Sequence, residues 1–158
     1  MMKLYAIMTM LLFGLLAACA TAPVDSDDAK TPDERAITML INSHLAAYNA
    51  ENTQAVLAAF APEARIESPL APGAAASRDQ YATMLRDVGF QYKAFLRELN
   101  VKVLSLQLAE AKAIVRLVDK DQNLKLIRVY RFERFEGTWR IIDARFEGPV
   151  PQLLHRQK

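Results

Sequence analysis

His44 and Tyr48 are the two side chains whose types and spacing most readily suggest chemistry in this sequence. They lie four residues apart, so on a helix they occupy the same face. A partly desolvated imidazole can act as a general acid or base, and a phenol one turn away can act as a donor. A histidine on an apolar helical face is more often a core residue, however, and a tyrosine there is more often a packing residue. The residues alone leave both interpretations open.

The rest of the sequence offers no second constellation of this kind. His44 and His155 are far apart and lack Cys, Asp or Glu at metal-ligand spacing, which argues against a zinc site. The sequence contains no G-x-S-x-G motif and no glycine-rich phosphate loop among its five glycines. We therefore expect neither a metal nor a cofactor, and His44 with Tyr48 are the only candidates for a catalytic role.

These two residues fall in the first of three helices that the sequence predicts. Thr31 and Glu34 form a capping box that begins this helix, which carries its apolar residues at the three- and four-residue spacing of one face. A short second helix is expected over 53–60. A second capping box at 77–80 begins a third helix, which Gly89 is placed to end.

The pattern changes to β-branched and aromatic runs after residue 100. We expect strands over 101–108, 113–118, 124–135 and 138–146, and a brief earlier strand over 65–68. Residues 69–76 are expected to form a loop that serves as a rim or lid, and residues 90–99 are ambiguous between helix and strand. Helices followed by hairpin-linked strands predict an α+β domain, with a curved antiparallel sheet and helices on one face.

The amino-terminal segment ends in Leu16-Ala17-Ala18-Cys19, which contains the only cysteine of the chain. It follows Lys3 and an apolar run of 13 residues, shorter than the ~20 that a membrane-spanning helix needs. The segment resembles a bacterial lipobox, which implies cleavage before Cys19 and acylation of its thiol. An Asp directly after the lipidated cysteine would favour retention in the inner membrane. This sequence has Ala20 at that position, which implies a cell-envelope lipoprotein of the outer membrane that faces the periplasm. An ordinary secretory signal is the alternative.

Charge and composition divide the remainder into a tether, a domain and a tail. Without Lys3, 19 of the 20 Lys and Arg residues remain against 18 Asp and Glu, so neither nucleic acid nor an acidic polymer is an expected partner. Between Ala20 and Thr31, Val24 is the only sizeable apolar side chain, which is too little apolar surface to order that segment. The expected organisation is a signal peptide at 1–18, a lipidated tether at 19–31, one domain at 32–148 and a carboxy-terminal tail at 149–158.

The segment from His44 to Pro69 resembles the opening of nuclear transport factor 2-like domains, which include steroid delta-isomerases and polyketide cyclases. Gly137-Thr-Trp-Arg-Ile141 is similar to the closing hairpin of that family. The resemblance covers roughly 34–146. It implies a cone-shaped, cystatin-like fold in which three helices pack on a curved antiparallel sheet, a pocket between the two layers, and frequent dimers through the outer sheet face. Many unrelated functions share this fold, so the fold alone implies no reaction.

The resemblance is closest to the steroid delta-isomerases, yet other residue types occupy the positions of their catalytic residues in this sequence. In those enzymes a tyrosine and a protonated aspartate form an oxyanion hole, and a second aspartate moves the proton. The resemblance places His44 at the position of the tyrosine and Ser68 at the position of the aspartate that moves the proton. Arg128 then occupies the position of the protonated aspartate of the oxyanion hole. A serine cannot take a proton from carbon near neutral pH as a carboxylate can. Glu67 is expected to point away from the pocket, because neighbouring strand residues face opposite sides. Steroid isomerase chemistry is therefore not expected.

Arg128 is the most unusual residue that this comparison singles out. The resemblance implies that it points into the cone with Tyr130, where a buried guanidinium requires an anion from the protein or from a ligand. The candidate ligand-binding residues are His44, Tyr48, Ser68, Arg128, Tyr130, Ile142 and Phe146. The other arginines of the strands are expected to form cross-strand charge pairs on a solvated or dimer-forming face. They are Arg116, Arg131, Arg134, Arg140 and Arg145.

These observations predict a membrane-anchored pocket domain that binds a small, partly apolar ligand with an acidic group and performs no catalysis. Two alternatives stay open. One is an isomerase, dehydratase or hydrolase that uses His44 and Tyr48, and the other is an envelope scaffold that presents its sheet to a partner protein.

Overall fold

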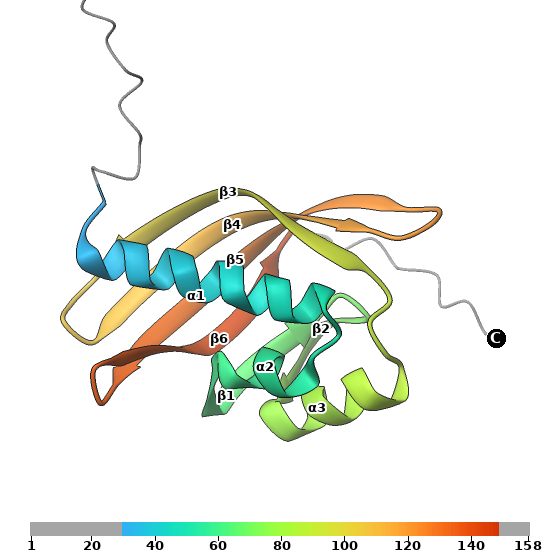
Figure 1. The fold of residues 1–158 in the computed structure, drawn as a ribbon, viewed down its shortest axis with the longest axis horizontal. Coiled ribbons are helices and arrows are strands. Elements are labelled where there is room, and N and C mark those ends of the chain that lie inside the picture. The colour runs from blue at the N-terminus through green and yellow to red at the C-terminus, as the bar shows by residue number, and fades with distance from the viewer. Residues whose placement is uncertain (1–29, 149–158) are drawn as a thin grey trace, which may run out of the picture.

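The computed structural model describes residues 30–148 (Figure 1). Cys19, the signal peptide, most of the tether and the tail from 149 lie outside the described residues. The helices are α1 (Pro32–Asn49), α2 (Thr53–Ala58) and α3 (Arg78–Asp87). The strands are β1 (Phe60–Ser68), β2 (Ala71–Ser77), β3 (Lys93–Val103), β4 (Leu108–Val118), β5 (Asn123–Phe135) and β6 (Thr138–Glu147).

The strands form one curved six-stranded sheet in the order β2-β1-β6-β5-β4-β3. All neighbouring strands are antiparallel except β1 and β6, which are parallel. The sheet curves around α1, which lies along its inner face, while α2 and α3 lie beside β1 (Figure 1). This α+β arrangement is the fold class that the sequence predicts. Within residues 30–148 no helix is long and apolar enough to cross a membrane.

Both predicted capping boxes are present. The Thr31 amide donates to a Glu34 carboxylate oxygen at 2.7 Å, and the Glu34 amide donates to the Thr31 hydroxyl at 3.2 Å. Ser77 and Gln80 exchange the equivalent bonds at the start of α3. Gly89 follows the end of α3 with a φ of +77°, which glycine adopts without strain.

Two predictions in the first half of the domain are wrong. Residues 69–76 are not a loop, because most of them form β2, which pairs with β1 as an edge strand. Its Ala-, Gly- and Pro-rich sequence has no β propensity, so the strand depends on this pairing. The second helix ends at Ala58 rather than residue 60, and Pro62 lies within β1, which begins earlier than predicted.

The boundaries around β3 and β4 also differ from the prediction. Most of the ambiguous 90–99 segment belongs to β3, and the strand predicted over 101–108 is divided by a turn between Val103 and Leu108. That turn contains neither Gly nor Pro. The Ser105 hydroxyl instead accepts from the amides of Gln107 and Leu108 at 3.2 and 3.1 Å, which reverses the chain.

The core lies between α1 and the inner face of the sheet. Its largest fully buried side chains include Tyr130, Phe60, Phe132, Ile37 and Ile41. Alternation along β5 points Arg128, Tyr130 and Phe132 inward, which gives Arg128 the direction that the resemblance implied.

The strand arginines have more varied partners than the predicted charge pairs. Arg131 forms the predicted exposed cross-strand ion pair with Glu110, whereas Arg145 pairs with Asp143 of its own strand. Arg116 and Arg140 donate instead to the Asn123 side chain and the Ala58 carbonyl.

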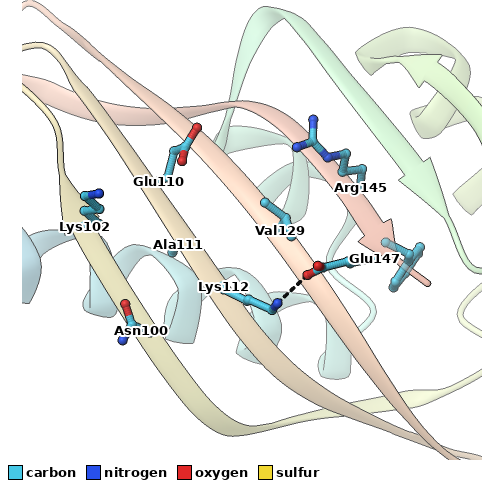
Figure 2. Close-up of a pocket in the computed structure, with 9 residues that line it drawn as sticks. Asn100, Lys102, Glu110, Ala111, Lys112, Val129, Arg145 and Glu147 are labelled. Carbon is cyan, nitrogen blue, oxygen red and sulfur yellow. Dashed lines mark ion pairs between the residues drawn. The ribbon is translucent and has the colours of Figure 1, made fainter.

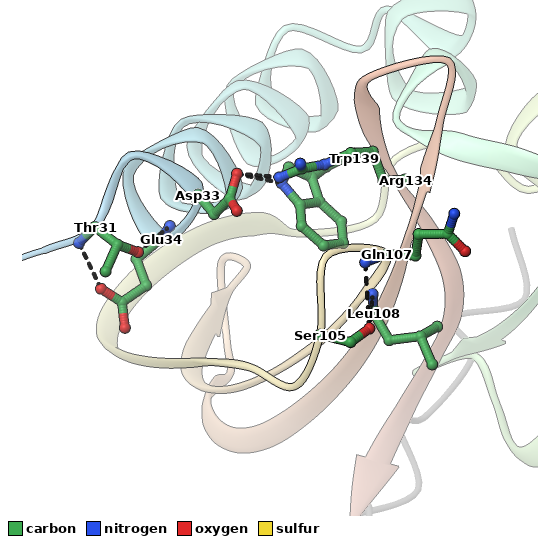
Figure 3. Close-up of polar contacts among 8 residues, drawn as sticks. All are labelled: Thr31, Asp33, Glu34, Ser105, Gln107, Leu108, Arg134 and Trp139. Atoms are coloured by element: carbon green, nitrogen blue, oxygen red, sulfur yellow. Dashed lines mark hydrogen bonds and ion pairs between the residues drawn. The ribbon is translucent and has the colours of Figure 1, made fainter.

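Arg134 corrects the prediction most clearly, since it is not on the outer face. It pairs with Asp33 of α1 and stacks on Trp139, with 4.5 Å between its guanidinium carbon and the ring centroid. The Trp139 indole donates to the same Asp33 carboxylate at 3.2 Å (Figure 3). This cluster ties the first turn of α1 to the β5–β6 hairpin.

Candidate functional site

Five of the seven predicted ligand-binding residues surround one cavity between α1 and the sheet. His44 and Tyr48 come from α1, Arg128 and Tyr130 from β5, and Phe146 from β6. The other lining residues are Leu45, Pro69, Tyr81, Ala94, Val115 and Leu117. The sequence did not identify these six residues, because apolar periodicity predicts burial and does not show whether a buried residue lines a cavity or packs in the core.

Ser68 and Ile142 do not line this cavity. Ser68 is buried, but its hydroxyl accepts from the Leu70 amide at 3.2 Å, and its neighbour Pro69 lies on the wall instead. Ile142 falls at the register shift between β5 and β6, where it has no opposite residue. A bulge of this kind changes the direction of side chains along the strand, so simple alternation misplaces it.

Glu67 is also unavailable as a base, for a reason beyond alternation. One of its carboxylate oxygens accepts from the Gly73 amide and the other accepts from the Phe146 amide at 2.9 Å. The Glu67 side chain therefore joins β2 to β6 through backbone hydrogen bonds. No Asp or Glu is among the residues that line the cavity.

The cavity is small and partly open to solvent. Its volume is about 30 Å³, and a single water needs roughly 10–15 Å³. This is enough for about two or three waters or for the head group of a ligand. Typical sites that enclose whole drug-sized molecules measure about 300–1,000 Å³, so a larger ligand would extend through the opening.

Arg128 is the only charged residue of the cavity wall. Its side chain is 8% exposed, and Nη2 donates to the Glu67 carbonyl at 3.0 Å. Its guanidinium carbon lies 4.6 Å from the centre of the Phe146 ring and 5.6 Å from that of Tyr130. Among residues 30–148 no carboxylate forms an ion pair with it. A buried cation here has aromatic neighbours but no counter-ion.

Three buried polar atoms around this cavity have no hydrogen-bond partner: Nδ1 of His44, Nε of Arg128 and the hydroxyl of Tyr130. Buried polar atoms are nearly always paired, so such a concentration indicates a place for water or ligand atoms. The other unpartnered atoms within the described part of the chain are dispersed over Arg78, Gln122, Arg134 and Asp143.

Comparison with known proteins defines the fold. No family model and no curated protein matches the sequence. An NTF2-like protein of unknown function from Pseudomonas putida KT2440 is 18% identical, with 76% of this chain and 89% of that one covered and a TM-score of 0.64. A Nostoc punctiforme protein with a cystatin-like fold is 13% identical, with 78% and 98% covered and a TM-score of 0.63.

The protein has the nuclear transport factor 2-like (NTF2-like) fold. A candidate scytalone dehydratase from Novosphingobium aromaticivorans also shares it, at 14% identity, 80% and 95% coverage and a TM-score of 0.62. Proteins of unknown function and a candidate enzyme thus share one architecture at these low identities. The likeness establishes the fold, and the chemistry must be argued from the NTF2-like cavity itself.

Burial and the uncompensated arginine determine the protonation of this cavity. Burial, and then the charge of Arg128, lower the pKa of His44 from 6.5 to about 4, opposed by a backbone hydrogen bond at Val56. Burial raises the pKa of Tyr81 to about 12 and raises the pKa of Tyr48 and of Tyr130 above the ordinary value. Near neutral pH the imidazole is therefore uncharged and all three phenols keep their protons.

The resulting site is rich in donors and positively charged. Neutral His44 uses its single N–H for the bond at the Val56 backbone, which leaves Nδ1 as an acceptor, while Arg128 and Tyr130 present unpartnered N–H and O–H groups. These groups suit a carboxylate or another anionic oxygen. The same features suit proton transfer poorly, because a histidine with a pKa of about 4 is a weak base. Among residues 30–148 no cluster of three His, Cys, Asp or Glu could hold a metal.

A second hollow lies on the outer face of the sheet, over β3, β4, β5 and β6 (Figure 2). Its charged side chains, Lys102, Glu110, Lys112, Arg145 and Glu147, are exposed to solvent. Lys112 and Glu147 form an ion pair of 2.6 Å across it. Charges of both signs in open solvent, already partly paired, make this a weaker candidate than the inner cavity.

Proposed function

We propose that this protein is a non-catalytic binding protein of the cell envelope, whose NTF2-like domain receives the acidic group of a small, partly apolar ligand at Arg128. The observation that carries the proposal is the uncompensated Arg128 guanidinium, 8% exposed and without a carboxylate partner in the described part of the chain. A buried charge with no partner is costly, so a bound anion would lower the free energy of this state.

The neighbouring groups favour a carboxylate over a neutral ligand. Its two oxygens could accept from Nε of Arg128 and from the Tyr130 hydroxyl, both of which lack partners. Hydrogen bonds between ionised groups are stronger than neutral ones, and the aromatic walls exclude water that would weaken them. Leu45, Pro69 and Leu117 supply apolar surface for the rest of the ligand.

The enzymatic alternative depends on His44 and Tyr48. One observation favours it, namely that Nδ1 of His44 has no partner and belongs to the wall of the cavity. The low pKa of this histidine and the lack of a carboxylate on the wall favour binding without turnover. An isomerase, dehydratase or hydrolase remains the competing function that the experiment below distinguishes.

The envelope location belongs to the same proposal and depends on Cys19. The lipobox-like Leu16-Ala17-Ala18-Cys19 supports acylation of this cysteine, and Ala20 supports the outer membrane. Radiolabelled palmitate should enter the wild-type protein and be absent from Cys19→Ser. A labelled Cys19→Ser protein would contradict the anchor without affecting the cavity proposal.

Native mass spectrometry of the full chain released from detergent tests the ligand. We expect an acidic adduct that co-purifies with the wild type and is lost in Arg128→Gln. Arg131→Gln is the matched control, because Arg131 lies on the same strand but is exposed and paired with Glu110. Circular dichroism checks that both variants fold. Undiminished binding in Arg128→Gln would remove Arg128 from the site, and chemical conversion of the adduct by the wild type would favour the enzyme.

A further inference from the structure

Large apolar side chains are exposed together at one end of the domain. Leu104, Leu106 and Leu108 lie in and beside the β3–β4 turn and are 46%, 81% and 38% exposed. Phe135, at the end of β5, is 41% exposed. We call these four residues the leucine tip. Single exposed apolar residues are ordinary, whereas a contiguous group marks a contact surface.

Backbone pairing holds the four residues side by side. The amides of Leu104 and Ser105 donate to the Leu108 carbonyl at 2.9 and 3.1 Å, which closes the turn. Leu108 is opposite Glu133 in the β4–β5 ladder, two residues before Phe135. The Arg134 amide also donates to the Gln107 carbonyl at 3.0 Å. The β3–β4 turn and the end of β5 therefore form one surface.

The leucine tip lies at the end of the domain where the chain enters from Cys19. Asp33, in the first turn of α1, bonds Arg134 and Trp139 at the same end of the sheet as Gln107 and Leu108 (Figure 3). The start of α1, the β3–β4 turn and the β5–β6 turn share one end of the ribbon (Figure 1). Eleven residues separate Cys19 from Thr31, a reach of at most about 40 Å at ~3.5 Å per residue.

We propose that the leucine tip docks on the lipid bilayer that holds Cys19. This inference rests on the proposed lipid anchor, because the short connection keeps this end of the domain near the membrane. Burial of leucine and phenylalanine side chains at the acyl boundary is favourable, and the uncharged polar neighbours Ser105 and Gln107 suit the headgroup level.

Docking would orient the cavity away from the lipid. Asp33 marks the membrane end of α1, whereas Tyr48 lines the cavity 15 residues further along the helix, about 22 Å at 1.5 Å per residue. Two other residues of the cavity wall are Pro69, in the β1–β2 turn, and Leu117, near the far end of β4. The leucine tip therefore positions the cavity to receive its ligand from the aqueous side.

Fluorescent labelling of the lipidated full chain in phosphatidylethanolamine–phosphatidylglycerol vesicles tests the docking. Cys19 is the only cysteine and is blocked by acylation, so Gln107→Cys provides a single reactive thiol beside the tip. Lys120→Cys, exposed in the β4–β5 turn at the opposite end, provides the control label. We expect a polarity-sensitive label at position 107 to shift to the blue and to be quenched by brominated lipid. The label at 120 should show neither effect.

Variants of the tip show which side chains are responsible. Leu104→Gln with Leu106→Gln should abolish the shift at position 107, whereas Met39→Gln, an equally exposed apolar residue on α1, should leave it unchanged. A label at 107 that stays in water while the protein remains on the vesicles would overturn docking and leave the anchor intact. A shift that needs no lipid and grows with protein concentration would assign the tip to a second copy instead. Protein that is neither palmitoylated nor recovered with vesicles would refute the anchor itself.

Discussion

Two arginines on β5 occupy similar surroundings but differ in one respect. Arg128 and Arg134 both lie against aromatic rings, at 4.6 Å from the Phe146 centroid and 4.5 Å from the Trp139 centroid. Asp33 neutralises Arg134, and no carboxylate of the described chain pairs with Arg128. The more deeply buried of the two cations is thus the one without an anion. Asp33 of α1 supplies the carboxylate at Arg134, whereas the position beside Arg128 stays open to a ligand anion.

The largest effect expected in the region around Arg128 is a loss of stability in acid that depends on His44. Its pKa is 6.5 when unfolded and about 4 when folded, mainly from burial and then from Arg128. The unfolded chain therefore binds the extra proton more readily, and stability present above pH 6.5 is lost as the pH falls towards 4. The full loss is about 3 kcal/mol at ~1.4 kcal/mol per pKa unit.

Urea unfolding of the wild type and His44→Gln at pH 7 and pH 5 measures this loss. The Asp and Glu carboxylates titrate in both proteins, so their contribution cancels when the stability changes of wild type and variant are subtracted. We expect the wild type to lose more stability on acidification than the variant. Identical losses would show that His44 is charged in the folded protein and would remove it from the cavity account.

Breaking the compensated pair should destabilise the domain. Asp33→Ala leaves the half-buried Arg134 without its carboxylate and the Trp139 indole without its acceptor. We expect the free energy of unfolding to fall by about 2 kcal/mol, less than for a fully buried pair because water reaches both partners. Thermal unfolding measures it, with Asp79→Ala in the first turn of α3 as a control for the helix dipole. An equal loss in both variants would show that the pair contributes nothing specific.

Removing the Arg128 cation should not lower the free energy of unfolding, in contrast to breaking the Asp33–Arg134 pair. Arg128→Met keeps the apolar stem and removes a charge that has no partner, so stability should stay constant or rise by about 1 kcal/mol. Arg134→Met should lower it, since Asp33 then loses its partner. Chemical denaturation of both proteins without ligand provides the comparison. A marked loss of stability in Arg128→Met would mean that the charge is structural, and the contrast between the two arginines would fail.

The sequence predicted the architecture better than the details of the site. Capping boxes, hairpin spacing and periodicity are local, so the helices and the last two strands were predicted closely. The strand β2 was missed because its alanines carry no propensity and its pairing with β1 is a tertiary effect. The alternation along β5 that turns Arg128 inward also turns Arg134 inward. The pairing of Arg134 with Asp33, about 100 residues earlier, could not be predicted from the local sequence.

Five of the seven predicted ligand-binding residues line one cavity, and the extent of that cavity was not predicted. The shared helical face predicted that His44 and Tyr48 lie together, and the family resemblance implied the inward direction of Arg128 and Tyr130. Ser68 and Ile142 were included although a hydrogen bond to Leu70 and a bulge in β6 keep them off the wall. The size of this cavity depends on how side chains from six helices and strands and from the β1–β2 turn pack, which no single segment encodes.

Nuclear magnetic resonance of arginine Nε–H groups in the nitrogen-labelled full chain tests the central claim most directly. The probe is butyrate, with butyramide as a neutral control of similar size. We predict that butyrate shifts the Arg128 Nε–H signal in a saturable manner, that butyramide does not, and that the Arg134 signal stays in place with both. An Arg128 signal unmoved by butyrate, or equal shifts at Arg128 and Arg134, would contradict an anion site in this cavity.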